Sequence, residues 1–404
     1  MIARTMPFNR TVLQVIPTLE AGGAERTTVE IARAIVAGGG RSLVVSGGGR
    51  LEAALDAEGS TVLRLPVQSK NPWVIWRNAA RLANLIKEHQ ADILHVRSRA
   101  PAWSALWAAR RTRTPLVATY HGAYGSASAL KRFYNSGLMR ADRVIANSEF
   151  TAQSIRALYG TSVERVLTIP RGADLAYFNP EAVDIGRIET LTAAWGLGGR
   201  SGQGFRLLAP ARLTPWKGQE DIIDALSILA GNSSIVRPVE KNGSGQDPEY
   251  TVVFCGDSQG KPDFERALQQ RMDGRGVRFE MKLAGHCADM PAAYAWCDAV
   301  LAPSRRPEAF GRVAVEAGAM GKPVIAAGHG GALETVIDGV TGVLTPPCDA
   351  EALAEAIDEI AGNSPQERAA MGAAARNHVA ENYSIEAMCK ATLLAYDELP
   401  RTRY

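Results

Sequence analysis

The sequence predicts an α/β protein of two domains, each built on a doubly wound parallel sheet with helices on both faces. Short apolar runs alternate with helical segments along almost the entire chain, and this alternation favours parallel strand pairing. The alternation stops once, at 170–184, where a glycine and two prolines indicate a connection between domains, and then restarts. At 404 residues the chain can form two hydrophobic cores.

The first domain is expected to span residues 1–172. Its apolar runs of four or five residues predict strands at 12–16, 42–46, 62–65, 93–96, 116–119, 143–146 and 166–169. Segments with apolar residues three and four positions apart predict helices at 24–37, 52–58, 73–89, 102–110, 129–139 and 151–159.

The second domain is expected to span residues 173–383. The same patterns predict strands at 205–209, 250–255, 277–283, 299–302 and 324–326. Helices are predicted at 219–229, 264–270, 290–296, 311–320 and 351–360. The polar, glycine-rich segment 231–249 predicts a mobile surface insertion, and 384–404 predicts an amphipathic helix at the end of the chain.

Composition indicates a soluble globular protein, with 46% hydrophobic and 22% charged residues. No apolar run approaches the 18 residues of a membrane-spanning helix, and the N-terminus lacks the pattern of a signal peptide. The five cysteines form no Cys-x-x-Cys pair, which favours reduced thiols and a cytoplasmic location.

Positive charge is concentrated in one part of the chain, although the net charge is only +3. Between Lys70 and Arg143 there are 13 Lys or Arg residues and three acidic ones, and four tryptophans lie among them. One interpretation is a helical surface that lies on the anionic inner face of the cytoplasmic membrane or meets an anionic acceptor. The other is a solvated helix face with the tryptophans in the core. The sequence leaves both open.

The segment 305–326 contains two carboxylates, Glu308 and Glu316, with seven residues between them. A helix that begins near Gly311 would present free N–H groups there, which suit a phosphate. The two carboxylates would lie on the order of 10 Å apart. This is too far for a pair that shares one reaction centre, which needs about 5 Å. It suits a ligand with hydroxyl groups at both ends and a diphosphate between them, as in a nucleotide sugar.

Further candidate residues follow predicted strands, where parallel sheets bind their ligands. Gly22 and Gly23 let the backbone approach a phosphate or sugar, but the G-x-G-x-x-G motif of dinucleotide sites is absent. Arg212 and Lys217 precede a helix and are candidates for a diphosphate clamp; the alternative is two exposed surface cations. His121 is a candidate to hydrogen-bond a sugar hydroxyl or leaving group; the alternative is a turn histidine bonded to backbone.

Arg97 and Arg99 follow the predicted strand at 93–96. They are candidates for binding a carboxylate or phosphate of an acidic acceptor. The alternative, that both are ordinary surface arginines, stays open.

These motifs resemble glycosyltransferase family 4, retaining enzymes of the GT-B fold, over nearly the whole chain. The resemblance implies two Rossmann-like domains with an interdomain cleft, and a C-terminal helix that packs back on the N-terminal domain. It implies that Glu308 contacts the hydroxyls of the donor sugar and that Glu316 contacts the nucleotide ribose. Arg212 and Lys217 would hold the diphosphate.

The same resemblance assigns the remaining donor contacts. The Gly22–Gly23 turn, Phe310 and Gly311 would line the donor site, and His121 together with Glu308 would act on the reacting hexose. Arg312 stands where many members carry an aliphatic residue, and this departure predicts a sugar pocket that differs from better known ones. No Asp-x-Asp tripeptide occurs, in agreement with the metal-independent character of the family. We therefore expect no metal and no cofactor.

The resemblance thus predicts a hexosyltransferase, with mannose as one candidate sugar and GDP or UDP as the donor nucleotide. The acceptor would be an acidic or lipid-linked glycan such as the lipopolysaccharide core, with no nucleic-acid partner. Two alternatives remain: a nucleotide-sugar epimerase of the same fold, and a non-catalytic nucleotide-sugar-binding subunit. The epimerase would leave the basic region unexplained. The binding subunit would be expected to lack Glu308, Lys217 or His121, and all three are present.

Overall fold

The protein was analysed as a computed structural model. It describes residues 7–20, 22–122, 128–160, 163–197, 204–231, 250–258, 260, 262–273 and 279–401. The insertion predicted at 231–249 lies, apart from Gly231, outside these ranges. The chain forms two compact units: unit 1 comprises Met1–Gly172 with Ile385–Tyr404, and unit 2 comprises Ala173–Ser384.

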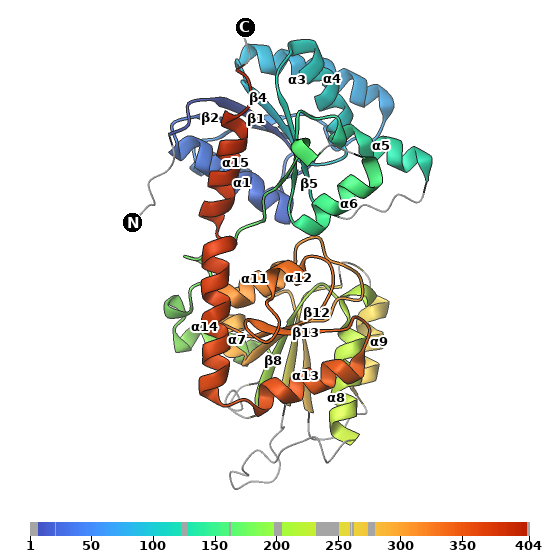
Figure 1. Cartoon of the computed structure of the whole chain (residues 1–404), viewed down its shortest axis with the longest axis vertical. Helices are drawn as coiled ribbons and strands as arrows, with labels where there is room; N and C mark the ends of the chain where they lie inside the picture. Colours follow the sequence, from blue (N-terminus) through green and yellow to red (C-terminus); the bar gives the residue numbers. More distant parts are fainter. Residues whose placement is uncertain are drawn as a thin grey trace. The chain divides into compact units, whose positions relative to one another are not determined.

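Unit 1 contains a seven-stranded parallel sheet in the order β3-β2-β1-β4-β5-β6-β7 (Figure 1). Its strands are β1 (Thr11–Val15), β2 (Arg41–Ser46), β3 (Thr61–Arg64), β4 (Ile93–Val96), β5 (Leu116–Tyr120), β6 (Arg143–Ala146) and β7 (Val166–Thr168). Its helices are α1 (Gly23–Ala37), α2 (Glu52–Ala57), α3 (Pro72–Glu88), α4 (Ala102–Thr112), α5 (Ala129–Met139), α6 (Glu149–Tyr159) and α15 (Ile385–Asp397).

Unit 2 contains a six-stranded parallel sheet in the order β10-β9-β8-β11-β12-β13. Its strands are β8 (Phe205–Pro210), β9 (Tyr250–Cys255), β10 (Phe279–Gly285), β11 (Ala299–Ala302), β12 (Val324–Ala327) and β13 (Gly342–Thr345). Its helices are α7 (Ile185–Ala194), α8 (Gln219–Gly231), α9 (Pro262–Met272), α10 (Met290–Trp296), α11 (Arg312–Ala319), α12 (Ala332–Thr335), α13 (Ala350–Gly362) and α14 (Pro365–Asn382).

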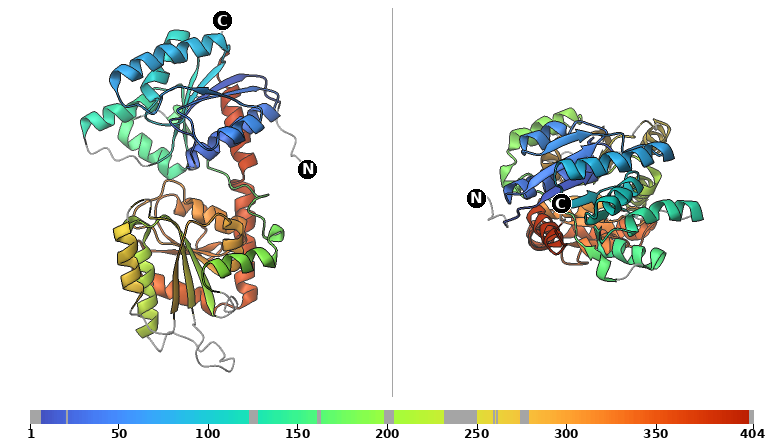
Figure 2. Two further views of the ribbon diagram at one scale, coloured as in Figure 1. Left: turned by 180° about the vertical axis from the view of Figure 1, so that it is seen from behind. Right: turned by 90° about the horizontal axis from the view of Figure 1, so that it is seen from above.

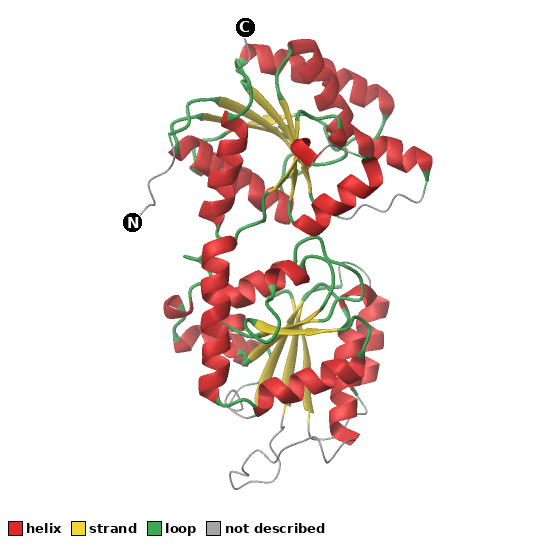
Figure 3. Ribbon diagram, in the orientation of Figure 1, coloured by secondary structure: helices red, strands yellow, loops and turns green. Residues whose placement is uncertain are grey.

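The predicted fold class is confirmed, because both sheets are parallel and carry helices on both faces (Figures 2 and 3). Three helices and one strand were not predicted: α7, α12, α14 and β13. Helices α7 and α14 have few buried side chains, so their sequences show little apolar periodicity. Their ends are nevertheless marked by capping side chains, Asp184 for α7 and Ser364 for α14.

Each sheet separates two hydrophobic layers, because successive residues of a strand point to opposite faces. In unit 1, Leu13 and Val15 pack with α3, α4, α5 and α6. Val12, between them, packs on the other face with α1 and α15. In unit 2, Leu208 belongs to the layer of α10, α11 and α14, whereas the adjacent Leu207 belongs to the layer of α8, α9 and α13.

The last helix, α15, packs against α1 in unit 1 (Figure 1). Its Tyr396 is fully buried and hydrogen-bonds the ring of His95 on β4, with 2.5 Å between the hydroxyl oxygen and Nδ1. Arg10 donates to the carbonyl oxygen of Tyr396 at 2.9 Å. The helix is shorter than the predicted 384–404, since it ends at Asp397 near Pro400. Within the described ranges, no helix combines the length and apolar character needed to cross a bilayer.

The topology of each sheet places candidate residues at the edge where the carboxyl ends of its strands lie. The carboxyl ends of parallel strands lie at one edge of their sheet, and ligands bind there, where the strand order reverses. In unit 1 the order reverses between β1 and β4, and in unit 2 between β8 and β11. The loops after these strands carry Arg97 in unit 1 and Lys217 and Glu308 in unit 2.

Candidate active site

In unit 2, the loop after β8 is pressed against the loop after β11. Lys217 ends a 3₁₀ helix (Pro215–Lys217), and Gly218 follows it with a φ of 76°. A Cβ at Gly218 would lie 2.0 Å from the carbonyl oxygen of Pro303, so only glycine allows this contact. The close approach holds Lys217 beside the segment from Ser304 to Glu308.

Lys217 and Glu308 form an ion pair, with 2.8 Å between Nζ and Oε1. Their side chains are 11% and 21% exposed, so the pair is shielded from bulk water. The hydroxyl of Ser304 also donates to Oε1 of Glu308. Oε2 has no hydrogen bond within the described part of the chain and is available to a ligand. The Lys217 ammonium additionally lies 4.3 Å from the centre of the Trp216 ring.

The Lys217–Glu308 pair lies at two adjoining cavities, which together we call the unit 2 cavity. The two share the lining residues Ala302, Ser304, Glu308 and Val313. Lys217 lines one of them, and Gly311 lines the other. Gly311 precedes α11 and has a φ of 75°, which glycine adopts without strain. The first free N–H groups of α11 therefore lie at the cavity that Glu308 also lines.

A segment that the sequence analysis did not single out holds the Glu308 loop. The backbone N–H of Gly331 donates to the carbonyl oxygen of Glu308 at 2.8 Å. A Cβ at Gly330 would lie 2.5 Å from the same oxygen, and a Cβ at Gly331 would lie 2.5 Å from Phe310. His329 donates through Nε2 to the carbonyl oxygen of Ser304 at 2.7 Å. In the sequence, the glycine pair Gly330–Gly331, which follows the predicted strand 324–326, could have indicated this segment.

Glu316 lies further along α11 and does not line the unit 2 cavity. Its carboxylate accepts hydrogen bonds from the hydroxyl of Tyr294 at 3.0 Å and from Nε of Arg312. Burial, followed by the charge of Glu316, raises the pKa of Tyr294 well above its usual range, so this phenol remains a donor. Arg312, the departure from the family pattern, therefore serves to orient Glu316.

Two predicted donor residues occupy other environments. The ring of Phe310 is only 5% exposed and packs edge-on against Tyr383, so its side chain belongs to the core. Only the backbone of Phe310 can meet a ligand. Arg212 is exposed, and its carbonyl oxygen accepts a hydrogen bond from Gln219 at 2.8 Å. Its side chain does not line the unit 2 cavity, whereas Lys217 lines it and pairs with Glu308.

In unit 1, helix α1 begins at Gly23, with Gly22 as its N-cap residue. Gly22 has φ −76° and ψ 165°, which any residue adopts. The atoms nearest to a Cβ there would be those of the Glu25 carboxylate, the far end of a flexible side chain. The fold therefore does not require glycine at this position, which leaves close approach of a ligand as a reason for it.

His121 follows β5 and is brought to Arg171, which follows β7. Nη2 of Arg171 donates to Nδ1 of His121 at 2.9 Å, so the neutral ring carries its proton on Nε2. Burial lowers the pKa of His121 well below its usual range, and the charges of Arg171 and Arg97 lower it further. A contact with the backbone carbonyl of Arg97 raises the pKa of His121 and so opposes part of this lowering. Nε2 of His121 nevertheless makes no hydrogen bond of normal geometry to the described residues.

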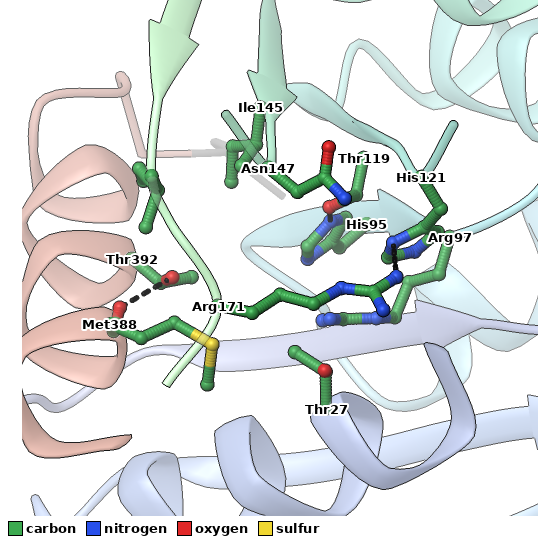
Figure 4. Close-up of a pocket in the computed structure, with 11 residues that line it drawn as sticks. Thr27, His95, Arg97, Thr119, His121, Ile145, Asn147, Arg171, Met388 and Thr392 are labelled. Atoms are coloured by element: carbon green, nitrogen blue, oxygen red, sulfur yellow. Dashed lines mark hydrogen bonds between the residues drawn. The ribbon is translucent and has the colours of Figure 1, made fainter. Parts of the chain in front are cut away.

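The structure separates the two predicted acceptor residues. Arg97 is 2% exposed and lines a cavity with His121 and Arg171 (Figure 4). Arg99 is half-buried and donates to Oδ1 of Asn135 on α5. Only Arg97 therefore shares a site with His121, and Arg171, which the sequence analysis did not consider, completes it.

The tryptophans of the basic region are largely outside the core. Trp73 and Trp76 on α3 are 64% and 58% exposed, and their rings stack with 5.1 Å between centres. Trp107 on α4 is 40% exposed, and Phe133 on α5 is 58% exposed. For these residues the interpretation that placed tryptophan in the core is wrong, whereas Trp103 is partly buried against the core.

Two parallel-sheet units of this topology are the architecture of the GT-B class of glycosyltransferases. Residues 21–177 match the model of Glycosyltransferase Family 4, and residues 199–378 match that of Glycosyl transferases group 1. The chain belongs to glycosyltransferase family 4, and the predicted transferase activity is thereby confirmed.

Curated relatives support this assignment. The chain is 30% identical over 321 residues to a GDP-mannose-dependent alpha-(1-6)-phosphatidylinositol monomannoside mannosyltransferase of Mycolicibacterium smegmatis, with 76% of each chain covered. It is 28% identical over 334 residues to a D-inositol 3-phosphate glycosyltransferase of Jonesia denitrificans, covering 77% of this chain and 72% of the relative.

Solved structures agree over almost the full length. A glycosyltransferase from Rickettsia africae matches with a TM-score of 0.84 and 32% identity, covering 96% of this chain and 98% of that one. Anabaena HepE in complex with UDP and glucose matches with a TM-score of 0.77 and 25% identity, covering 97% and 100%. Within the described part of the chain, no group of three His, Cys, Asp or Glu side chains is arranged to hold a metal ion.

Proposed function

We propose that this glycosyltransferase moves a hexose, with retention and without a metal, from a nucleoside diphosphate to an acidic or lipid-linked glycan. The observation that carries the proposal is the Lys217–Glu308 pair at the unit 2 cavity. A carboxylate with one free oxygen suits the hydroxyls of a sugar, and an adjacent ammonium suits a diphosphate. Unit 2 is accordingly the donor-binding domain, and unit 1 is the acceptor-binding domain.

The donor occupies unit 2 from the sugar to the ribose. Glu308 accepts hydrogen bonds from the hexose hydroxyls, and Glu316, oriented by Tyr294 and Arg312, accepts from the ribose. Lys217, Arg212 and the backbone at Phe310 and Gly311 bind the diphosphate. GDP and UDP are both supported as the nucleotide, since the mycobacterial relative is named as GDP-mannose-dependent and HepE was solved with UDP.

Departure of the diphosphate is the step that most needs stabilisation, because negative charge develops on the leaving oxygen. Lys217 and the N-terminus of α11 supply positive charge there, so no metal ion is needed. The backbone of the Gly22–Gly23 turn approaches the donor, and the neutral His121 donates a hydrogen bond through Nε2. The acceptor hydroxyl then attacks from the face that the diphosphate leaves, which retains the anomeric configuration.

The acceptor is assigned to unit 1, where Arg97 and Arg99 carry the positive charge. The names of the relatives include a phosphorylated acceptor, D-inositol 3-phosphate, and a lipid-linked one, phosphatidylinositol monomannoside. The lipopolysaccharide core combines both properties, since it is acidic and lipid-linked. It is therefore one acceptor to be tested.

The basic and aromatic surface of unit 1 supports contact with the inner face of the cytoplasmic membrane. Helices α3, α4 and α5 are neighbours, and they expose Trp73, Trp76, Trp107 and Phe133. Exposed Lys and Arg side chains on the same helices are Arg77, Arg81, Lys87, Arg110, Arg111, Lys131 and Arg132. Aromatic rings favour the interface of a bilayer, and cations favour its anionic lipids. A lipid-linked acceptor lies in the membrane, so the enzyme would meet it at the membrane that this surface of unit 1 contacts.

Replacing both Trp73 and Trp76 with serine should reduce binding to vesicles of phosphatidylglycerol at least about tenfold, since two interfacial anchors are lost. Sedimentation with the vesicles measures the effect. Ile185→Ser, on α7 of unit 2 and 68% exposed, is the control and should bind as the wild type does. Equal binding of the double variant and the wild type would rule out α3 as the membrane contact.

Thermal denaturation with GDP, UDP, ADP and their sugar conjugates, with and without EDTA, tests the donor assignment. One nucleotide family should raise the melting temperature, and EDTA should not remove the effect. Sugar transfer to added acceptor then separates a transferase from a binding subunit, which would be stabilised without turnover. Conversion of the sugar without any acceptor would instead indicate the epimerase. If no nucleotide raises the melting temperature, the donor assignment is wrong.

A further inference from the structure

The unit 1 cavity contains a buried arginine that forms no ion pair with a carboxylate of the described residues. The cavity is lined by Thr27, His95, Arg97, Thr119, His121, Ile145, Asn147, Ile169, Arg171, Met388 and Thr392. Arg97 is 2% exposed, and its hydrogen-bonded partner is the neutral Oε1 of Gln14, at 2.8 Å from Nη1. Within the described residues, no carboxylate forms an ion pair with Arg97. Its Nε–H, also buried, has no hydrogen-bond partner there.

An arginine buried in this way is costly to the fold. A charged group without an opposite charge loses its hydration and regains little in return, and a buried N–H without an acceptor adds to the loss. Burial lowers the pKa of Arg97, and the charges of Tyr396, Glu30 and Cys389 oppose this effect only in part. A guanidinium nevertheless keeps its proton in proteins, so the charge remains. Such an uncompensated group is explained when a ligand supplies the missing negative charge.

The other polar groups of the unit 1 cavity point to an oxyanion with a neighbouring hydroxyl. Arg171 brings a second guanidinium, held by its contact with His121. In Figure 4 the side chains of Arg97 and Arg171 extend into the same cavity beside the His121 ring. Nε2 of His121 is a donor without a hydrogen bond of normal geometry, and Oδ1 of Asn147 is a buried acceptor without a partner, both among the described residues. The donors suit an anion, and the acceptor suits a sugar hydroxyl.

The position of these groups is that of a ligand site. Arg97, His121, Asn147 and Arg171 follow β4, β5, β6 and β7, which are four adjacent strands of one parallel sheet. Their carboxyl ends meet at one edge, which begins at the reversal of strand order between β1 and β4. His95, by contrast, is satisfied on both ring nitrogens, by Tyr396 and Thr119, and serves the fold.

We propose that Arg97 and Arg171, beside His121, bind the acidic group, a phosphate or a carboxylate, of the sugar acceptor. The inference rests on the proposed function in taking the ligand to be the acceptor. The two guanidinium groups supply the charge, and their planar N–H groups match the paired oxygens of either anion. Asn147 accepts from a hydroxyl on the same sugar. The acidic group thereby selects acidic over neutral acceptors.

The test measures binding of glucose 6-phosphate, glucuronate and glucose to the full chain by calorimetry. At least one of the two anionic sugars should bind, and glucose should bind at least about tenfold more weakly. Binding of glucose 6-phosphate alone identifies a phosphate-bearing acceptor, and binding of glucuronate alone identifies a carboxylate-bearing one. If neither anion binds more tightly than glucose, the proposal is wrong.

Variants locate the binding. Arg171→Met, and separately the double substitution Gln14→Leu with Arg97→Met, should each weaken binding of the anionic sugar about 10–100-fold. The double substitution removes both members of a buried polar pair and also the hydrogen bond from Gln14 to the carbonyl oxygen of Thr28, so its melting temperature is measured to verify folding. Lys217→Met, in unit 2, should leave glucuronate binding unchanged, which excludes the diphosphate site as its source.

Arg10→Met is the matched control, because Arg10 is a buried arginine of the same unit that pairs with the carboxylate of Asp397 and donates to the carbonyl oxygens of Tyr396 and Asp397. This variant should lose stability and keep its affinity for the anionic sugar.

Nucleotide binding separates the two proposals. If nucleotides stabilise the protein but the Arg171 and Arg97 variants bind anionic sugars normally, this inference fails alone. If those variants lose nucleotide binding, the cavity belongs to the donor and the inference is overturned. Failure of nucleotides to bind the wild type refutes the proposed function itself.

Discussion

Replacing Glu308 with glutamine should lower kcat/KM for transfer by about 10²–10³-fold while the protein stays folded. Oε1 of Glu308 is occupied by Lys217 and Ser304, so Oε2 is the oxygen left for the sugar hydroxyls. Glutamine keeps the shape of the side chain but loses the charge that attracts Lys217 and strengthens hydrogen bonds from the hexose. Losses of this size are typical when one polar group that stabilises the transition state is removed.

The matched control for Glu308 is Glu280→Gln. Glu280 also pairs with a lysine in unit 2, Lys282, at 3.2 Å, and its side chain is 18% exposed, close to the 21% of Glu308. It does not line the unit 2 cavity. The control should transfer sugar at the wild-type rate. Steady-state kinetics measure kcat/KM of both variants, and melting temperatures verify that both are folded. Near-normal activity of Glu308→Gln would show that Glu308 is not part of the site.

Replacing Lys217 with methionine should reduce kcat/KM by a similar factor, about 10²–10³-fold, because the developing charge on the diphosphate loses its nearest side-chain cation. Methionine keeps most of the length of the side chain and its contact with Trp216. The loss should depend on the ligand: affinity for the nucleoside diphosphate should fall about 10–100-fold, whereas affinity for the nucleoside should not change. Calorimetry with both ligands measures the difference.

Lys282→Met is the corresponding control, since it removes the lysine of the Glu280 pair and leaves the cavity intact. It should bind both ligands as the wild type does. An equal loss of nucleoside and nucleoside diphosphate in Lys217→Met would indicate a collapsed pocket rather than a missing phosphate contact. It would refute the role assigned to Lys217.

The two pairs of variants also separate binding from catalysis. If Lys217 binds the diphosphate equally in the ground state and the transition state, its loss appears mainly in KM. If it acts on the departing charge, kcat falls as well, and we expect this result. Glu308→Gln should affect kcat more than the affinity for free nucleotide, because the carboxylate is assigned to the sugar and not to the nucleotide.

Local patterns were sufficient for the parallel α/β architecture. A strand and a helix differ in the spacing of their apolar residues, and glycine and proline mark their ends, so β9, α10 and β11 were predicted with the residues that the structure gives them. Helices α7 and α14 were missed for the same reason, because they bury few side chains and carry little periodicity. The start of α11 at Gly311 was predicted because glycine marks it locally.

The sequence by itself determined the fold class, the glycosyltransferase family and the loops that carry Lys217 and Glu308, because these depend on residue type and short spacing. Only the tertiary structure decided which of these side chains meet. It separated Arg97 from Arg99, placed the Phe310 ring in the core, and joined His121 to Arg171, 50 residues away. Contacts between distant loops depend on strand order and on close backbone approaches such as that at Gly218, which no local pattern encodes.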